Sequence, residues 1–385
     1  MFLQNQPSDQ QEEYVRLLKL VGGLSNLFSS NKSPYLPYRL HENIFAKALE
    51  ASNESRSDVS VDAVKGKTGI GLKTFLFKNS QYEKVAEFNK LLPEYKNLDP
   101  KGQIEFIAQA RNDRLEATMR IYDLDEIMYH CVSRANGRFI MFEEDMDLID
   151  LSSMKIDKFT DGIINFHDIK NKYKFNVSKS TLQKKFIPKD TFEFDVEIHN
   201  DPYELLLGLG ETTGGIYEVK SLVKKEIIKD QNSIILPLYS TKGDLRVPQR
   251  SGLNQWNALG RPRNPNEVYV PIPIWIHKVF DGFFPPKDQP FELKLPGDDS
   301  ISVRVCQAKG KALMSKPNSD LGEWLLRTVL NIPEGMLVTY EMLAKINIDS
   351  VQIVKISDIL YEIDFKSLGS FEDFNLSYNP KFTLK

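Results

Sequence analysis

The chain has 385 residues, 41% hydrophobic and 27% charged, which is an ordinary globular composition and long enough for two domains. Cys131 and Cys306 lie too far apart for a zinc knuckle, and the absence of a signal-peptide core or a run of about 20 apolar residues leads us to expect a cytoplasmic protein without a membrane partner. A net charge of −3 excludes a generally basic surface, so any contact with nucleic acid must be local.

The first half of the chain predicts helices around a small number of strands. Helical spacing of Leu40, Ile44, Phe45 and Leu49 predicts a helix from Arg39. The other expected elements are a helix over 10–29, a hairpin with strands 59–64 and 70–76, helices over 80–92 and 100–122, and strands at 138–144 and 172–178. This order indicates an α/β or α+β core.

Beyond residue 230 the pattern changes to short strands separated by Pro, Gly and Asp. The β-rich runs are NSIILPLYS, NEVYVPIPIWI, FELKLPG, SISVRVCQA, VQIVKIS and YEIDF, and LGEWLLRTVL is helical. Many short strands with one or two helices favour a small barrel. We therefore predict an N-terminal α/β domain over 1–228 and a mostly-β pseudobarrel over 229–385.

The hairpin carries charges that a nuclease could use. Asp62 and Lys73 lie on its two strands, which a short turn makes neighbours, and Glu42 on the preceding helix offers a second carboxylate. Carboxylates hold Mg²⁺, and a lysine can offset the charge that develops on a phosphate. Solvated hairpin charges are the alternative, but both strands are apolar, and an unpaired charge there would be costly.

The runs LHENIF, SDVSVDA and GIGLKTF resemble the catalytic core of PD-(D/E)XK-type restriction endonucleases. In that family a helix glutamate, a strand aspartate and a lysine on the next strand form a Mg²⁺ site. The resemblance implies that Glu42, Asp62 and Lys73 are catalytic and that Asp62 and Glu42 bind Mg²⁺. Gly71 departs from the family, which has Asp or Glu there, and some members take this acid from elsewhere in the chain.

Two other clusters compete with this assignment or could add to it. Asp201, Glu218 and Lys220 match the PD-(D/E)XK motif more closely than the hairpin does. Their sequence is typical of a solvated strand end near the domain boundary, so they are the runner-up site. On the long helix, Arg111 and Arg114 could contact phosphates from one turn. Pairing with the acids around them (Glu105, Asp113 and Glu116) is the interpretation that we prefer.

Two basic, amide-rich loops mark the second half as a DNA-binding region. Arg reads guanine edges, Asn and Gln read adenine edges, and Lys and hydroxyl groups contact phosphates. Solvated loops are the alternative, which Trp256 and the run of amides disfavour. The residues predicted to contact DNA are Arg246, Arg250, Ser251, Asn254, Gln255, Trp256, Asn257, Arg261 and Arg263 in the first loop, and Gln307, Lys309, Lys311, Ser315 and Asn318 in the second.

As an ordered set over 233–365, the runs LPLYS, SGLNQWNA, GRPR, EVYVPIP, QAKGKAL and PNSDLGEWLLR resemble the B3-like DNA-recognition domain of NgoFVII-like restriction endonucleases. In that fold two arms grip the major groove, which implies arms at 246–263 and 307–319 here. Known NgoFVII-like enzymes carry a phospholipase-D nuclease, whose H-x-K motif this chain lacks, so only the recognition half of the resemblance transfers.

Together the two resemblances imply a type II restriction endonuclease that cuts double-stranded DNA with Mg²⁺. We expect a homodimer on DNA, because cutting both strands needs two sites or two successive nicks. A cognate DNA methyltransferase is the expected partner in the same system. The alternatives are a non-catalytic, sequence-specific DNA-binding regulator and the nuclease subunit of a larger ATP-dependent restriction complex.

Overall fold

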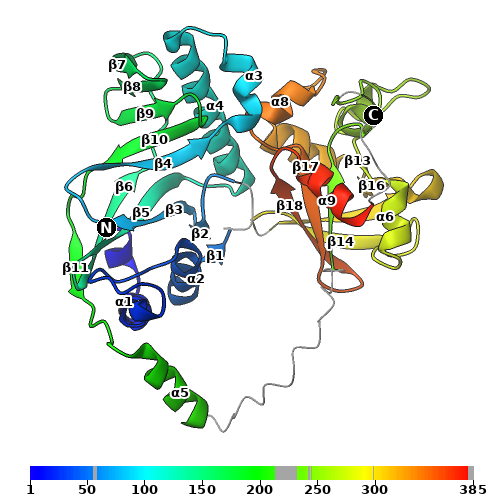
Figure 1. Ribbon diagram of the computed structural model, residues 1–385. Coiled ribbons are helices and arrows are strands. Elements are labelled where there is room, and N and C mark those ends of the chain that lie inside the picture. The colour runs from blue at the N-terminus through cyan, green and yellow to red at the C-terminus, as the bar shows by residue number, and fades with distance from the viewer. Residues whose placement is uncertain (55–58, 213–231, 242, 244, 298, 380–385) are drawn as a thin grey trace.

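The chain folds into two lobes that lie side by side, as the computed structural model shows (Figure 1). The structure describes residues 1–54, 59–212, 232–241, 243, 245–297 and 299–379. The predicted domain boundary at 228–229 falls outside these residues and stays a prediction. In the described part of the chain, no helix is both long and apolar enough to cross a membrane.

The first sheet of the N-terminal lobe has, among the described residues, the strand order β1-β2-β3-β5-β6-β11. Its strands are β1 (Ser52–Asn53), β2 (Ala63–Lys65), β3 (Thr68–Leu76), β5 (Glu126–Ala135), β6 (Arg138–Asp145) and β11 (Phe192–Asp195). The predicted hairpin is confirmed as β2 and β3, but its first strand is shorter than predicted: residues 59–62, Asp62 among them, precede β2 instead of forming part of it. The predicted strand at 138–144 is confirmed as β6. β3 pairs in parallel with β5, which places Gly71 beside Tyr129 and Lys73 beside Cys131.

The strand β3 is covered on both faces. Its residues Ile70 and Leu72 pack into one hydrophobic core with α1 (Ser8–Gly23) and α2 (Tyr38–Leu49). On the opposite face, Phe75 packs with Leu115 of α4 (Pro100–Ile121), the long helix that the sequence predicts. Because side chains alternate along a strand, Gly71 and Lys73 share the face of Phe75 and α4.

The second sheet has the order β4-β10-β9-β8-β7 within the described residues. Its strands are β4 (Gln81–Glu87), β10 (Thr181–Phe186), β9 (Lys172–Asn176), β8 (Ile163–His167) and β7 (Lys155–Thr160). The helix predicted over 80–92 is therefore wrong for residues 81–87, and only its end is helical, as a 3-10 turn (Asn89–Leu91) that leads into α3 (Leu92–Tyr95). Antiparallel pairing with β10, about a hundred residues later, overrides the local pattern.

The C-terminal lobe is a barrel-like sheet with the described strand order β12-β17-β18-β14-β15-β16-β13. The end strands β12 and β13 contact each other, so the sheet is nearly closed, and the predicted β-rich pseudobarrel is confirmed to that extent. The strands are β12 (Ser233–Pro237), β13 (Val270–Pro271), β14 (Pro290–Lys294), β15 (Ser300–Cys306), β16 (Ala312–Ser315), β17 (Ser350–Lys355) and β18 (Leu360–Lys366).

One of the β-rich runs predicted in the C-terminal lobe is partly helical in the structure. The run over 266–276 holds only the two-residue strand β13, because its prolines limit ladder hydrogen bonds, and α6 (Ile274–Val279) follows. LGEWLLRTVL is helical as predicted, with α7 (Asp320–Gly322) leading into a π-helical segment, Glu323–Val329. The remaining α-helices described are α8 (Tyr340–Lys345) and α9 (Ser370–Tyr378), and α5 (Pro202–Thr212) follows the N-terminal sheets.

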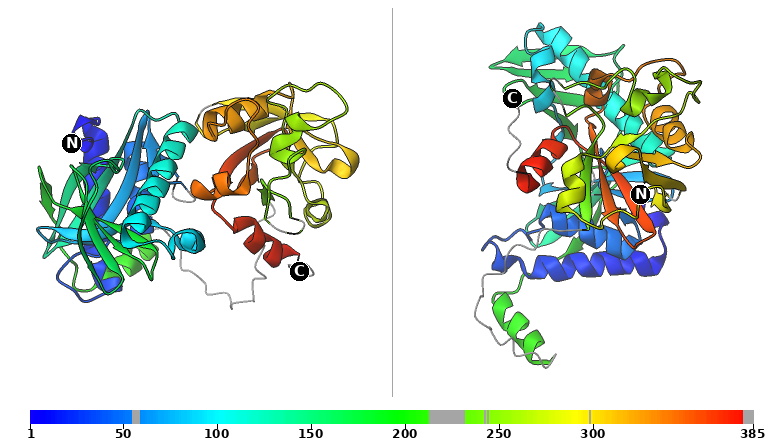
Figure 2. Two further views of the ribbon diagram at one scale, coloured as in Figure 1. Left: turned by 90° about the horizontal axis from the view of Figure 1, so that it is seen from above. Right: turned by 90° about the vertical axis from the view of Figure 1, so that its right-hand side faces the viewer.

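The two lobes share hydrophobic cores along α4, which lies at their junction (Figure 2). Ile121, Tyr122 and Leu124 pack into the core of the C-terminal lobe. Conversely, Ala344 and Leu368 of the C-terminal lobe pack into the core beneath α4. Arg120 Nε on α4 also donates a hydrogen bond of 3.2 Å to the carbonyl oxygen of Val329. The lobes are thus joined by packing as well as by the chain.

A buried chain of hydrogen bonds fixes α1 and α2 against the first sheet. Tyr14 Oη lies 2.8 Å from His41 Nε2 and 3.0 Å from His130 Nε2, and His130 Nδ1 lies 3.0 Å from Glu143 Oε1. All four side chains are buried. Burial, and then the neighbouring His130, lower the pKa of His41 well below its ordinary value of 6.5.

This shift predicts that the fold loses stability on mild acidification. Below pH 6.5 the unfolded chain binds a proton at His41 that the folded chain excludes, so the free energy of unfolding falls by up to about 1.4 kcal/mol per pH unit. Urea unfolding of wild type and His41→Gln between neutral pH and about pH 5 checks this. The variant should be less stable at neutral pH but should show a shallower decline; parallel curves would contradict a buried neutral His41.

Candidate functional site

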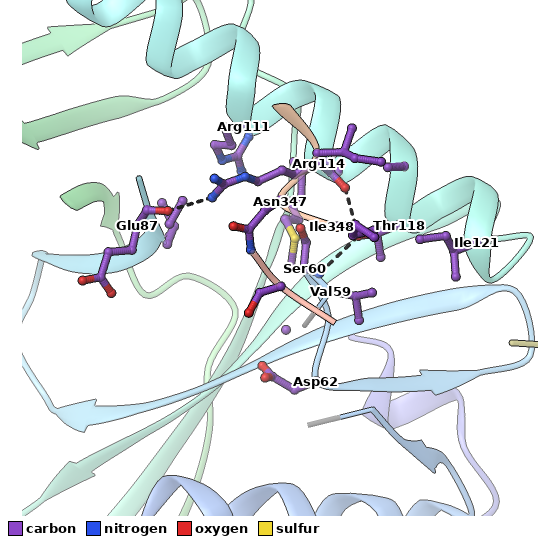
Figure 3. Close-up of a pocket in the computed structure, with 18 of the residues that line it drawn as sticks. Val59, Ser60, Asp62, Glu87, Arg111, Arg114, Thr118, Ile121, Asn347 and Ile348 are labelled. Carbon is purple, nitrogen blue, oxygen red and sulfur yellow. Dashed lines mark hydrogen bonds between the residues drawn. The ribbon is translucent and has the colours of Figure 1, made fainter. Parts of the chain in front are cut away.

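A hollow of about 340 Å³ lies at the junction of the two lobes (Figure 3). From the N-terminal lobe it is lined by two of the predicted catalytic residues, Asp62 and Lys73, and by two arginines of α4. The C-terminal lobe contributes Asn347, Ile348 and Ser367. The structure therefore brings an acid and a lysine from the hairpin together in a space that both lobes enclose.

Asp62 is held in place by the strand next to it. Its backbone N–H donates to the carbonyl oxygen of Ile70 at 2.8 Å, and its Oδ2 accepts from the N–H of Leu72 at 2.7 Å. Burial raises the pKa of Asp62, while the charge of Lys73, the Leu72 N–H and the charge of Arg39 act in the opposite direction. A buried carboxylate with a raised pKa gains free energy from a further cation, as a metal-binding acid does.

The position where the resembled family carries its second acid, Gly71, packs closely against two side chains. A Cβ atom on Gly71 would lie 2.6 Å from Met146 Cε and 3.1 Å from Tyr129 Cδ1. Any side chain at residue 71 must displace the end of Met146, which is a flexible side chain that can move. The packing of Met146 and Tyr129 thus favours a small residue at this position without requiring glycine.

Glu42 lies on α2 and is nearly buried, with 6% of its surface exposed. Its Oε2 accepts a hydrogen bond of 3.0 Å from Arg39 Nη1, and the charge of Arg39 also reaches Asp62. The described residues that line the hollow do not include Glu42. The structure therefore links Glu42 to Asp62 through Arg39 and leaves its predicted catalytic role untested.

Glu83 is a carboxylate that the sequence interpretation missed. It lies half-buried on β4; burial raises its pKa, while the charges of Lys73 and Lys78 act in the opposite direction. Lys73 is thus close enough to interact with both Asp62 and Glu83. The helix predicted over residues 80–92 gives no reason to place Glu83 on a strand near the hairpin, so the sequence does not identify this carboxylate.

The carboxylates at the hollow suit Mg²⁺ better than a metal that needs three or more protein ligands. In the described part of the chain, no group of three or more His, Cys, Asp or Glu could hold a metal ion by itself. Mg²⁺ is typically bound by one or two carboxylates together with waters and phosphate oxygens of the substrate. Asp62 supplies one such carboxylate, and Glu42 and Glu83, neither of which is among the described residues that line the hollow, are candidates for a second.

Asp201, the first residue of the runner-up site, has a structural role at the beginning of a helix. Asp201 is exposed and precedes α5, where its Oδ1 accepts from the N–H groups of Tyr203 at 3.0 Å and Glu204 at 3.4 Å. This is the geometry of a residue that caps the beginning of a helix. Glu218 and Lys220 lie outside the described residues.

Two residues predicted to contact DNA are fully buried in the structure. Asn254 Nδ2 donates to the carbonyl oxygens of Pro248 and Val338 at 3.1 and 2.9 Å, and its Oδ1 accepts from the N–H of Val338 at 2.9 Å. Ser315 Oγ accepts from the N–H of Leu321 at 2.9 Å. Both side chains are used inside the protein, where they hold the surrounding loops in shape.

The other predicted contacts divide into anchored and exposed groups. Arg261 and Arg263 reach the buried carboxylate of Glu267, with N–O distances of 2.7 and 3.3 Å. Asn257 Nδ2 donates to the carbonyl oxygen of Gln249 at 3.0 Å, and Trp256 packs partly against the core of the lobe. Four cations are exposed, namely Arg246, Arg250, Lys309 and Lys311, and four polar residues are half-buried, namely Ser251, Gln255, Gln307 and Asn318.

Comparison with known protein families confirms the resemblance of the C-terminal lobe. Residues 226–357, about a third of the chain, match the NgoFVII C-terminal B3-like DNA-binding domain. This match supports a DNA-binding function of the restriction-enzyme type, with double-stranded DNA as the partner. It does not extend to the hairpin of Asp62 and Lys73. Comparison with curated proteins gives no match.

Substitutions in the first arm should separate DNA contact from structure. Arg250→Ala removes an exposed charge, so we expect weaker binding to duplex DNA and a stability change within about 0.5 kcal/mol. The slope of the logarithm of the binding constant against the logarithm of the salt concentration should be smaller by about one. Asn254→Ala leaves buried groups of Pro248 and Val338 without partners and should cost about 1–3 kcal/mol of stability. Titrations of labelled duplex at several salt concentrations measure binding, and urea unfolding measures stability. If the dependence of the binding constant on salt is unchanged in Arg250→Ala, this residue does not belong to the DNA surface.

Proposed function

We propose that the chain is a type II restriction endonuclease, in which the C-terminal lobe binds a specific double-stranded DNA sequence and the hollow hydrolyses the phosphodiester bond with Mg²⁺. The observation that carries the proposal is the convergence of Asp62 and Lys73 in a hollow completed by a lobe that resembles a DNA-binding domain. Neither a DNA-binding lobe alone nor a charged hairpin alone accounts for this arrangement.

The residues of the hollow suit phosphodiester hydrolysis. Mg²⁺, when bound, would polarise the phosphate and lower the pKa of a water molecule. Asp62 would hold it together with Glu42, or with Glu83 in its place. Lys73, whose Nζ lies 5.9 Å from the centre of the Tyr129 ring, would stabilise negative charge that develops on the phosphate. Apolar neighbours such as Val59 and Ile348 limit water and strengthen these interactions.

Cutting a duplex places two further requirements on the protein. One hollow contacts one strand, so a double-strand break needs two copies of the chain or two successive nicks, and we propose a homodimer on DNA. A host that makes a site-specific endonuclease must also protect its own recognition sites. We therefore propose a cognate DNA methyltransferase as the partner in the same system.

Digestion of a sequenced plasmid tests the proposal directly. We expect the purified chain to cut at fixed sequences with Mg²⁺, and Asp62→Asn and Lys73→Met to lower the cleavage rate by about a hundredfold or more while duplex binding persists. Lys84→Met, an exposed charge change on β4, is the matched control. Cleavage that survives Asp62→Asn would disprove the catalytic assignment, and a wild type that binds DNA but never cuts it would favour a DNA-binding regulator.

The second acid can be identified by its effect on the metal requirement. If Glu42 or Glu83 holds Mg²⁺ with Asp62, replacing it by Gln should raise the Mg²⁺ concentration needed for half-maximal cleavage by about 10- to 100-fold. We predict this for one of the two variants and a near-normal requirement for the other. Cleavage rates over a Mg²⁺ titration provide the measurement. A normal requirement in both variants would mean that neither carboxylate binds the metal.

A further inference from the structure

The wall of the hollow opposite Asp62 in the view of Figure 3 is cationic. Arg111 and Arg114 lie one turn apart on α4, and both line the hollow. Arg111 is 2% exposed, and burial lowers the pKa of Arg114 to about 10. Two guanidinium groups are therefore held in a partly dry space close to the candidate catalytic residues.

Neither arginine makes the ion pair that the sequence favours. Among the described residues, no carboxylate lies within 4 Å of either guanidinium, and Glu116 pairs instead with Arg120. Arg111 Nη1 donates to the carbonyl oxygen of Asp147, and Arg114 Nη1 donates to that of Glu87, both at 2.7 Å. Backbone carbonyl groups orient the two side chains without neutralising them.

Part of the donor capacity of these arginines is unused in the part of the chain that the structure describes. The buried atoms Arg111 Nη2 and Arg114 Nε have no hydrogen-bond partner there, although Arg114 also stacks on the Phe88 ring with its Cζ 4.4 Å from the ring centre. Burying a charged donor without a counter-charge costs free energy. An anion that enters the hollow would offset this cost.

The size and lining of the hollow indicate which anion fits. Guanidinium groups bind phosphate oxygens in a bidentate manner, and about 340 Å³ accommodates a phosphate with part of a nucleotide but not a duplex. Asn347 adds an amide from the C-terminal lobe, where a left-handed backbone with φ of 61° turns the chain from α8 toward β17. A phosphate group is therefore the anion that best matches this lining.

We propose that Arg111 and Arg114 form a phosphate-binding site that holds the DNA strand at a phosphate adjacent to the one that is cut. This inference rests on the proposed function for the identity of the strand, whereas the anion site itself does not. The two arginines bind and position the substrate; they do not take part in bond breaking. Their role is to fix the strand between α4 and the hairpin, so that the neighbouring phosphate reaches Asp62 and Lys73.

Inorganic phosphate tests the anion site without DNA. We expect phosphate to raise the Tm of the full-length wild type more than chloride does at equal ionic strength. The double variant Arg111→Gln/Arg114→Gln should lose this difference, whereas Lys101→Gln, which removes an exposed charge from the same helix, should retain it. An equal phosphate response in the wild type and the double variant would overturn the site.

Cleavage kinetics test whether the phosphate belongs to DNA. Arg111→Lys and Arg114→Lys keep the charge and most of the packing but lose bidentate binding, so we expect kcat/KM for plasmid cleavage to fall by about tenfold, mainly through KM. Unchanged kinetics beside a lost phosphate response would overturn the assignment to the DNA strand. A wild type that never cuts DNA but shows the arginine-dependent phosphate response would contradict the proposed function and support the anion site.

Discussion

The two-sided burial of β3 is the constraint on which the candidate site depends. Ile70 and Leu72 face α1 and α2, so Gly71 and Lys73 must face α4 and the hollow. A shift of one residue in pairing would exchange the two sets and bury Lys73 among apolar side chains. The hydrogen bond from the Leu72 N–H to Asp62 and the contact of Met146 with Gly71 both fit only the observed register. The placement of Lys73 in the hollow is therefore a consequence of strand packing.

The sequence predicted the parts of this arrangement that depend on local patterns. The hairpin, the long helix α4 and the β-rich C-terminal lobe are visible in the spacing of apolar residues, and Asp62 with Lys73 follows from the hairpin. The segment β4 is predicted wrongly as a helix, because its strand conformation depends on pairing with β10, far along the chain. The strands β5, β7, β8, β10 and β11 are absent from the prediction altogether. Because β4 is not predicted as a strand, Glu83 is not recognised as a carboxylate near the hairpin. Register between distant strands leaves little trace in a single sequence.

Side-chain roles in the loops were harder to predict than the elements. Asn254 and Arg250 belong to one polar run, yet the first is fully buried with three hydrogen bonds and the second is exposed. Composition cannot separate these roles, because an amide that shapes a loop and an amide that reads a base are the same residue. Arg111 and Arg114 show the same problem on a helix, since nearby acids suggested ion pairs that the structure replaces with backbone carbonyl groups.

The shared cores at the junction limit how such a protein can change its target. Ile121, Tyr122 and Leu124 complete the hydrophobic interior of the C-terminal lobe, and Ala344 and Leu368 complete that of the N-terminal lobe. A C-terminal lobe transplanted from another protein would expose these surfaces unless it carried matching ones. Domain shuffling is thus a poor route to new specificity here. Gradual substitution at exposed residues of the C-terminal lobe, such as Arg246 and Lys309, is the route that this architecture leaves open.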